Sequence, residues 1–279
     1  MNYFERAKYF RTKKRLGQNF LINGEVIADI IDYANISADD TVLEIGPGVG
    51  FVTEQLIKHA KKVIAIELDE EAIKELKKLN APNLEIIHND ILKTDLSSLC
   101  EGKIKVVANI PYYITSPIIA HLLGEIDDLN NKNRAKITDI ILMVQEEVAR
   151  RMCADENSQG KQYGLLTILS KFWADVEILR TVGKKCFYPA PKVTSALVKL
   201  TVREKPLLDL SDYSHFRKTI RAGFAQRRKN IKNCLLNGGF SKDAISKSLS
   251  ELGIDENTRG EKLSITTFGA LSELLKKYC

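Results

Sequence analysis

Two kinds of apolar pattern alternate along the first two thirds of the chain. Predominantly apolar runs at 42–45, 63–66 and 104–108 are short and bounded by polar or glycine-rich segments, which predicts buried strands. Between them, segments such as 25–34 and 69–79 place apolar residues three and four positions apart, which predicts amphipathic helices. Further strands are expected at 84–88, 138–144, 176–182 and 197–202, and further helices at 51–60, 118–123, 145–152 and 163–173. This alternation is typical of an α/β protein built on a mainly parallel sheet.

The pattern changes near residue 204, after which every periodic segment is helical. Helices are predicted at 213–224, 228–236, 242–252 and 265–278. We therefore expect a catalytic domain over residues 1–204, including an N-terminal arm, and a small helical domain over 205–279.

A glycine-rich turn follows the first strand of the α/β part. The sequence Gly46-Pro47-Gly48-Val49-Gly50 joins the strand to a helix, as in the opening unit of a Rossmann-like fold. Its spacing is G-x-G-x-G, whereas dinucleotide-binding proteins typically have G-x-G-x-x-G. Glu67 and Asp90 follow the next two strands, where carboxylates could accept hydrogen bonds from ribose hydroxyls and from an adenine amine. These positions predict a nucleotide-like ligand at one edge of the sheet.

The fourth strand ends in Asn109-Ile110-Pro111-Tyr112. Asn109 offers a carbonyl acceptor, Pro111 stiffens the backbone, and Tyr112 offers a flat ring for stacking. This combination suits a planar aromatic amine, although a plain turn with a core tyrosine has the same residues. Phe187, in a proline-rich loop before the last strand, belongs to no apolar period and could provide a second stacking face.

Composition restricts the classes of protein further. Of the 279 residues, 44% are hydrophobic and 28% charged, as in soluble globular proteins. No apolar stretch reaches the roughly 20 residues of a membrane span, and the N-terminus lacks the apolar core of a signal peptide. The five cysteines are scattered without a CxxC pair, so neither a disulfide framework nor a zinc site is indicated. We expect a cytoplasmic protein with no metal and no membrane partner.

Positive charge is concentrated in two segments. The net charge is +6, yet residues 1–16 carry +5 and residues 213–242 carry +8, so the remainder is acidic. Such a distribution favours binding to a polyanion, whereas one basic segment alone would be typical of a solvated helix face. The RNA-binding candidates are Lys13, Lys14, Arg15, Arg221, Arg227, Arg228 and Lys229.

Five motifs together extend over most of the chain. They are Leu16-Gly17-Gln18-Asn19-Phe20-Leu21, Glu44-Ile45-Gly46-Pro47-Gly48-Val49-Gly50, Asn109-Ile110-Pro111-Tyr112, Phe187-Tyr188-Pro189-Ala190-Pro191-Lys192-Val193 and Phe224-Ala225-Gln226-Arg227-Arg228-Lys229. With them the sequence closely resembles the bacterial small-subunit (16S) rRNA adenine dimethyltransferases. The last motif favours these ribosome-assembly enzymes over the relatives that modify large-subunit rRNA.

The resemblance implies an S-adenosylmethionine (SAM)-dependent enzyme. It would dimethylate the N6 amines of two adjacent adenines near the 3′ end of 16S rRNA, within the 30S subunit or its precursor, and act as a monomer in subunit biogenesis. The implied cofactor contacts, extended to neighbouring positions, are Gln18, Asn19, Leu21, Gly46, Gly48, Glu67, Leu68, Asp90, Ile91 and Asn109. The implied catalytic residues are Asn109, Ile110, Pro111, Tyr112 and Phe187.

Three alternatives remain at this point. A 23S rRNA adenine dimethyltransferase of the macrolide-resistance type would share most motifs, and a non-catalytic ribosome-assembly factor could keep the fold. An NAD-dependent dehydrogenase is disfavoured by the glycine spacing. One departure from the family pattern is Tyr113, where many relatives carry asparagine.

Overall fold

A computed structural model describes residues 2–13, 16–160 and 162–278. Contacts divide the chain into two compact units. The first comprises 1–124, 130–149 and 174–203, and the second comprises 125–129, 150–173 and 204–279. The second unit thus takes in two segments that precede residue 204, since 125–129 and 150–173 pack with the C-terminal helices. The assignment of separate functions to the two parts stays a prediction.

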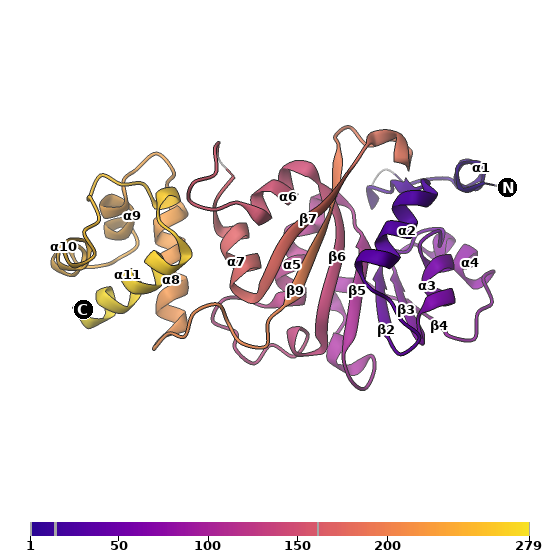
Figure 1. Ribbon diagram of the computed structural model, residues 1–279, viewed down its shortest axis with the longest axis horizontal. Coiled ribbons are helices and arrows are strands. Elements are labelled where there is room, and N and C mark those ends of the chain that lie inside the picture. The colour runs from indigo at the N-terminus through magenta and orange to yellow at the C-terminus, as the bar shows by residue number, and fades with distance from the viewer. Residues whose placement is uncertain (1, 14–15, 161, 279) are drawn as a thin grey trace. The chain divides into compact units, whose positions relative to one another are not determined.

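The first unit is built on a seven-stranded sheet with the order β4-β3-β2-β5-β6-β9-β7 (Figure 1). The strands are β2 Thr41–Ile45, β3 Lys62–Glu67, β4 Leu84–His88, β5 Ile104–Asn109, β6 Ile137–Gln145, β7 Ala174–Val182 and β9 Ser195–Val202. Strands β2 to β6 are parallel, whereas β9 runs antiparallel to both β6 and β7. The expected α/β fold is confirmed. The antiparallel β9 departs from the all-parallel order of dinucleotide-binding Rossmann folds.

Helices precede the first strand of the sheet or connect its parallel strands, and they cover the sheet. They are α2 Gly24–Tyr33, α3 Thr53–His59, α4 Glu70–Lys77, α5 Thr115–Leu123 and α6 Glu146–Cys153. Strand β3 is buried at five consecutive positions, which requires cover on both faces of the sheet. The side chain of Asn23 caps α2 by accepting a hydrogen bond from the backbone of Val26.

The N-terminal segment is more regular than expected. Residues Tyr3–Tyr9 form helix α1, which the sequence analysis did not predict. The two-residue strand β1, Phe20–Leu21, pairs antiparallel with β8, Phe187–Tyr188. The sequence predicted neither strand, because a two-residue pairing between segments so far apart leaves no periodic pattern in either segment.

The second unit is helical in its described part. It contains α7 Leu165–Trp173, α8 Tyr213–Ala225, α9 Ile231–Asn237, α10 Lys242–Glu251 and α11 Ile265–Lys277. Its core includes the fully buried rings of Phe172, Phe216 and Phe268. Helix α9 begins three residues later than predicted, because Asn230 accepts a hydrogen bond from the backbone of Asn233 and caps the helix there. No helix among the described residues has the length and apolar character needed to cross a bilayer.

Strand β2 carries an acidic side chain into the core. Glu44 is 3% exposed, and its Oε2 atom has no hydrogen-bond partner among the described residues. Burial raises the pKa of Glu44 to about 8, and the neighbouring carboxylate of Glu67 adds to the shift. Since burial of a charged carboxylate is costly, the neutral form is the one that the fold favours.

The raised pKa of Glu44 predicts that stability falls as pH rises. The folded protein holds a proton that the unfolded chain releases near its ordinary pKa of 4.5, so the free energy of unfolding decreases between about pH 4.5 and pH 8. In Glu44→Gln the side chain has no carboxyl proton to release, so this pH-dependent decrease in the free energy of unfolding is absent. The drop in melting temperature between pH 6 and pH 9, measured by circular dichroism, should therefore be smaller than in the wild type. Glu177→Gln, an exposed position on β7, is the matched control. Equal drops in Glu44→Gln and the wild type would contradict the assignment.

Candidate active site

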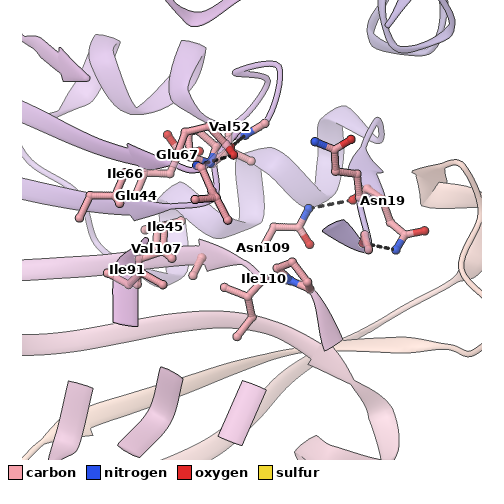
Figure 2. Close-up of a pocket in the computed structure, with 18 of the residues that line it drawn as sticks. Asn19, Glu44, Ile45, Val52, Ile66, Glu67, Ile91, Val107, Asn109 and Ile110 are labelled. Carbon is pink, nitrogen blue, oxygen red and sulfur yellow. Dashed lines mark hydrogen bonds between the residues drawn. The ribbon is translucent and has the colours of Figure 1, made fainter. Parts of the chain in front are cut away.

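A cavity opens at the carboxyl ends of β2, β3 and β5, beside the turn that follows β4 (Figure 2). The order of the strands reverses between β2 and β5, and ligands of open α/β sheets bind at such a reversal. Residues from the arm also line it. The lining includes Gln18, Asn19, Leu21, Gly46, Gly48, Glu67, Leu68, Asp90, Ile91, Asn109, Ile110, Pro111 and Tyr112. The structure thus brings together every predicted cofactor residue and four of the five predicted catalytic residues.

The glycine turn shapes one wall of this cavity. Gly46 and Gly48 have φ angles of +67° and +58°, which glycine adopts at little cost. A Cβ atom at Gly48 would also lie 2.7 Å from the ring of Phe20 in the arm. Glycine is therefore required at position 48 both for the backbone conformation and for the close packing of the arm.

Glu67 lies at the end of β3 and is 7% exposed. Its Oε2 accepts a hydrogen bond from the backbone of Gly48 at 2.9 Å, and its Oε1 accepts from the backbones of Leu68 and Asp69, each at 2.8 Å. Burial raises the pKa of Glu67, although these three hydrogen bonds oppose the shift. A carboxylate has about four acceptor sites. In this conformation one site remains for a ligand hydroxyl.

Asp90 occupies the turn after β4. Its Oδ1 accepts a hydrogen bond from the backbone of Leu92 at 3.0 Å and so caps a short 3-10 helix, Ile91–Lys93. Ile91 is buried, whereas Leu68 is 51% exposed. These two apolar side chains and one carboxylate make a surface with a polar edge, which suits a purine ring that carries an amine.

Asn109 ends β5, and the arm fixes its side chain. The Nδ2 atom donates a hydrogen bond to the backbone oxygen of Asn19 at 3.1 Å. Because this contact uses the amide nitrogen, the Oδ1 atom is oriented as an acceptor. Pro111, with φ of −58°, stiffens the turn that follows. The turn therefore offers an oriented side-chain acceptor together with backbone carbonyls.

Tyr112 is half-buried and held at its hydroxyl. Its Oη lies 2.5 Å from Oγ of Ser195, the fully buried first residue of β9. Burial raises the pKa of the Tyr112 phenol. The next residue, Tyr113, is 63% exposed and also lines the cavity. It lies beside Gly17 of the arm, where an added Cβ would come within 3.2 Å of its ring.

Phe187 does not line the cavity, in contrast to the position that its sequence context indicated. Its side chain is 3% exposed and belongs to the core cluster that contains Phe20 and Leu21, and it is not part of the cavity lining. The pairing of β8 with β1 holds it there. The expectation that Phe187 presents a stacking face is wrong for this conformation.

The basic residues predicted to bind RNA have different surroundings. Lys13 forms an ion pair with Asp69, and Lys14 and Arg15 lie outside the described residues. Arg221 on α8 forms an ion pair with Glu125, in which the Nη2 and Oε1 atoms lie 3.4 Å apart. Arg227 is half-buried, whereas Arg228 and Lys229 are exposed in the turn between α8 and α9. The turn with Arg228 and Lys229 is exposed, and the Arg221 side chain is 57% exposed beside Glu125.

Three residues that contribute to this geometry were not predicted as site residues from the sequence. They are Asp69, which contacts the arm, Ser195, which holds Tyr112, and Tyr113 at the cavity wall. Asp69 carried a signal only as the cap of α4. Ser195 followed a proline-rich loop without any pattern of its own.

Comparisons with known proteins point to one family. The family model described as ribosomal RNA adenine dimethylase matches residues 9–277. A ribosomal RNA small subunit methyltransferase A from Clostridium perfringens is 42% identical over 273 residues, covering 96% of this chain and 92% of that protein. The protein of the same name from Clostridium acetobutylicum is 43% identical over 270 residues, covering 95% of this chain and 94% of that protein.

Solved structures include two similar enzymes. A dimethyladenosine transferase from Plasmodium falciparum has a TM-score of 0.73 at 31% identity, covering 89% of this chain and 94% of that one. The 23S rRNA methyltransferase ErmE has a TM-score of 0.71 at 27% identity, covering 92% of this chain and all of that one. With a family model that spans nearly the whole sequence, the chain belongs to the ribosomal RNA adenine dimethylase family.

Proposed function

We propose that this protein uses SAM to dimethylate the N6 amines of two adjacent adenines near the 3′ end of 16S rRNA, within the 30S subunit or its precursor. The observation that carries the proposal is the oriented Asn109 amide at the end of β5, beside a cavity with a glycine turn. The small-subunit enzymes from Clostridium that cover more than nine tenths of the chain favour 16S over 23S rRNA.

We further propose that the protein acts as a monomer.

The cavity fits the cofactor. Glu67 keeps one acceptor site for a ribose hydroxyl, Asp90 provides an acceptor for the adenine amine, and Leu68 and Ile91 provide apolar contact. Bound there, SAM supplies an electrophilic methyl group. All other contributions come from the protein and consist of binding, orientation and electrostatic stabilisation.

The Asn109 turn acts on the target amine. An adenine N6 amine is a weak nucleophile because its lone pair is delocalised into the ring. We infer that Oδ1 of Asn109 and a backbone carbonyl of Ile110 or Pro111 accept its two N–H groups, which draws the lone pair out of conjugation. The Asn109 oxygen is already oriented by the contact with Asn19, so little reorganisation is required.

The target base must leave its stack before it reaches this turn. Extrusion costs a few kcal/mol, and stacking on an aromatic side chain returns about 1–3 kcal/mol per base. Tyr112 is the primary stacking face that we propose. Because Phe187 is buried, the exposed ring of Tyr113 is the second candidate.

The first prediction tests the reaction and its substrate. Wild-type protein incubated with radiolabelled SAM should label isolated, undermethylated 30S subunits and not 50S subunits. In Asn109→Ala the rate should fall by about 100-fold or more, since an oriented hydrogen-bonding group at a reacting centre contributes this much. Binding of SAM, measured by calorimetry, should be at least partly retained. Label that appears only in 50S subunits would overturn the proposed substrate, and unchanged transfer would overturn the role of Asn109.

A second prediction concerns the hydrogen bond between Tyr112 and Ser195. If this contact positions the ring, Tyr112→Phe and Ser195→Ala should each lower kcat by up to about 10-fold, the effect of one hydrogen bond. The double variant should be no slower than the slower single variant, because both changes remove the same bond. Multiplicative effects in single-turnover assays would show that the two side chains act independently.

A third prediction concerns the basic turn between α8 and α9. If the protein contacts about six phosphates, log affinity for rRNA should fall with log salt concentration at a slope of about −5. The double variant Arg228→Gln/Lys229→Gln should reduce the magnitude of that slope by about 2. The charge-matched control Lys58→Gln/Lys61→Gln, at exposed positions on and beside α3, should leave the slope unchanged. Fluorescence anisotropy with a labelled rRNA fragment, at a series of salt concentrations, measures the slope for each protein. Identical slopes for the two double variants would refute a specific role for the turn.

A further inference from the structure

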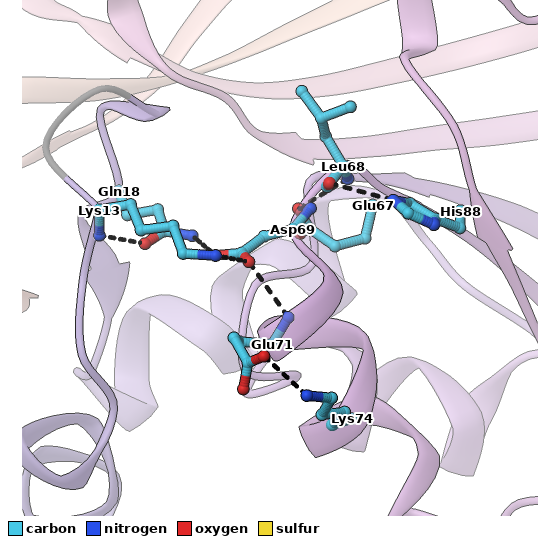
Figure 3. A network of polar contacts seen from close by, with 8 residues as sticks. All are labelled: Lys13, Gln18, Glu67, Leu68, Asp69, Glu71, Lys74 and His88. Carbon is cyan, nitrogen blue, oxygen red and sulfur yellow. Dashed lines mark hydrogen bonds and ion pairs between the residues drawn. The ribbon is translucent and has the colours of Figure 1, made fainter.

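A polar network joins the N-terminal arm to the loop that follows β3 (Figure 3). The side chain of Gln18 uses both ends of its amide. Its Oε1 accepts a hydrogen bond from the backbone of Lys13 at 2.7 Å, and its Nε2 donates to Oδ2 of Asp69 at 2.7 Å. The ammonium group of Lys13 forms an ion pair with the other oxygen of Asp69. Gln18 is therefore held by the protein at both polar atoms.

Asp69 is buried and is itself fixed in place by a hydrogen bond to the start of α4. It is 2% exposed, and its Oδ1 caps α4 by accepting a hydrogen bond from the backbone of Glu71 at 3.1 Å. Burial alone would raise the pKa of Asp69, but hydrogen bonds from Lys13 and Gln18 outweigh it and keep the pKa below its usual value. The backbone of Asp69 also donates to Glu67. Asp69 is thus hydrogen-bonded directly to a residue that lines the cavity.

The residue after Gln18 reaches the opposite side of the cavity. The backbone oxygen of Asn19 accepts the hydrogen bond from Asn109 that orients the proposed catalytic amide. The arm packs closely at the flanking positions as well. A Cβ at Gly17 would lie 3.2 Å from Pro111, and the ring of Phe20 packs against Gly48. Two consecutive residues of the arm therefore connect the loop after β3 with the turn after β5.

We propose that Gln18 and Asp69 are positioning residues that hold the arm so that the Asn19 carbonyl fixes the Asn109 amide in its productive orientation. This inference rests on the proposed function of Asn109 and assigns a cause to its geometry. If the arm moved away, the amide could rotate and present its NH₂ group, a donor, to the target amine. The catalytic step would then lose its acceptor while the walls around Glu67 and Asp90 stayed in place.

This role differs from a direct contact between Gln18 and the cofactor. A direct contact makes the affinity for SAM depend on Gln18 alone. A positioning role makes the rate depend on the match between residues 18 and 69, because one must donate and the other accept. Exchanging the amide of residue 18 with the carboxylate of residue 69 distinguishes a positioning role from a direct contact with the cofactor.

The exchange uses Gln18→Glu, Asp69→Asn and their combination. Gln18→Glu places two carboxylates against each other and should lower kcat by up to about 100-fold, the cost of a displacement of about 1 Å at a reacting group. The dissociation constant for SAM should change much less. In the double variant the amide introduced at position 69 donates to the carboxylate introduced at position 18, while the oxygen of that amide keeps the cap of α4, so most of kcat should return. Asp95→Asn, an exposed aspartate that caps a 3-10 helix, is the matched control for the aspartate change and should leave kcat unchanged.

Amide hydrogen exchange of residues 16–21 provides a measurement that needs no substrate. Exchange should be faster in Gln18→Glu than in the wild type and should return towards the wild-type rate in the double variant. Equal exchange in all variants, or a double variant no faster in catalysis than Gln18→Glu, would overturn the inference. A wild-type protein that transfers no methyl group would instead refute the proposed function, and the exchange measurement would still decide whether Gln18 and Asp69 hold the arm.

Discussion

The hydrogen bond from Asn109 to the backbone oxygen of Asn19 connects the two parts of the site that are far apart in sequence. Strand β5 supplies the amide, and the arm supplies the acceptor that orients it. A carboxamide has a donor and an acceptor of nearly the same shape, so its own strand cannot determine which one faces a substrate. The chemistry proposed here requires the oxygen to face the amine. The site therefore depends on where the arm lies.

Acidic side chains impose a second constraint on this part of the fold. Glu44 and Glu67 are both almost completely buried at neighbouring strands, where charged groups are costly. The fold accommodates them differently. Glu67 accepts three backbone hydrogen bonds from the glycine turn and the loop after β3, whereas Glu44 has a pKa raised to about 8 and is mainly neutral near neutral pH. The three hydrogen bonds to Glu67 favour its ionised form and so oppose the rise that burial causes in its pKa.

The chain is similar both to small-subunit rRNA methyltransferases and to a 23S rRNA methyltransferase. ErmE, a 23S rRNA methyltransferase, has the same fold over 92% of this chain. The exposed basic turn between α8 and α9 belongs to the second unit and lies outside the cavity lining. Differences at such surfaces can change the RNA that is bound without altering the catalytic turn.

The sequence by itself determined the strand ends and therefore most of the cavity. Gly46, Glu67, Asp90 and Asn109 each follow an apolar run, and the carboxyl ends of parallel strands meet at one edge of a sheet. Tertiary structure decided the rest. The β1–β8 pairing buries Phe187, Ser195 reaches Tyr112 from β9, and Asp69 holds Gln18 of the arm from the loop after β3. These contacts join residues more than 50 positions apart, and local periodicity carries no information about partners at such distances.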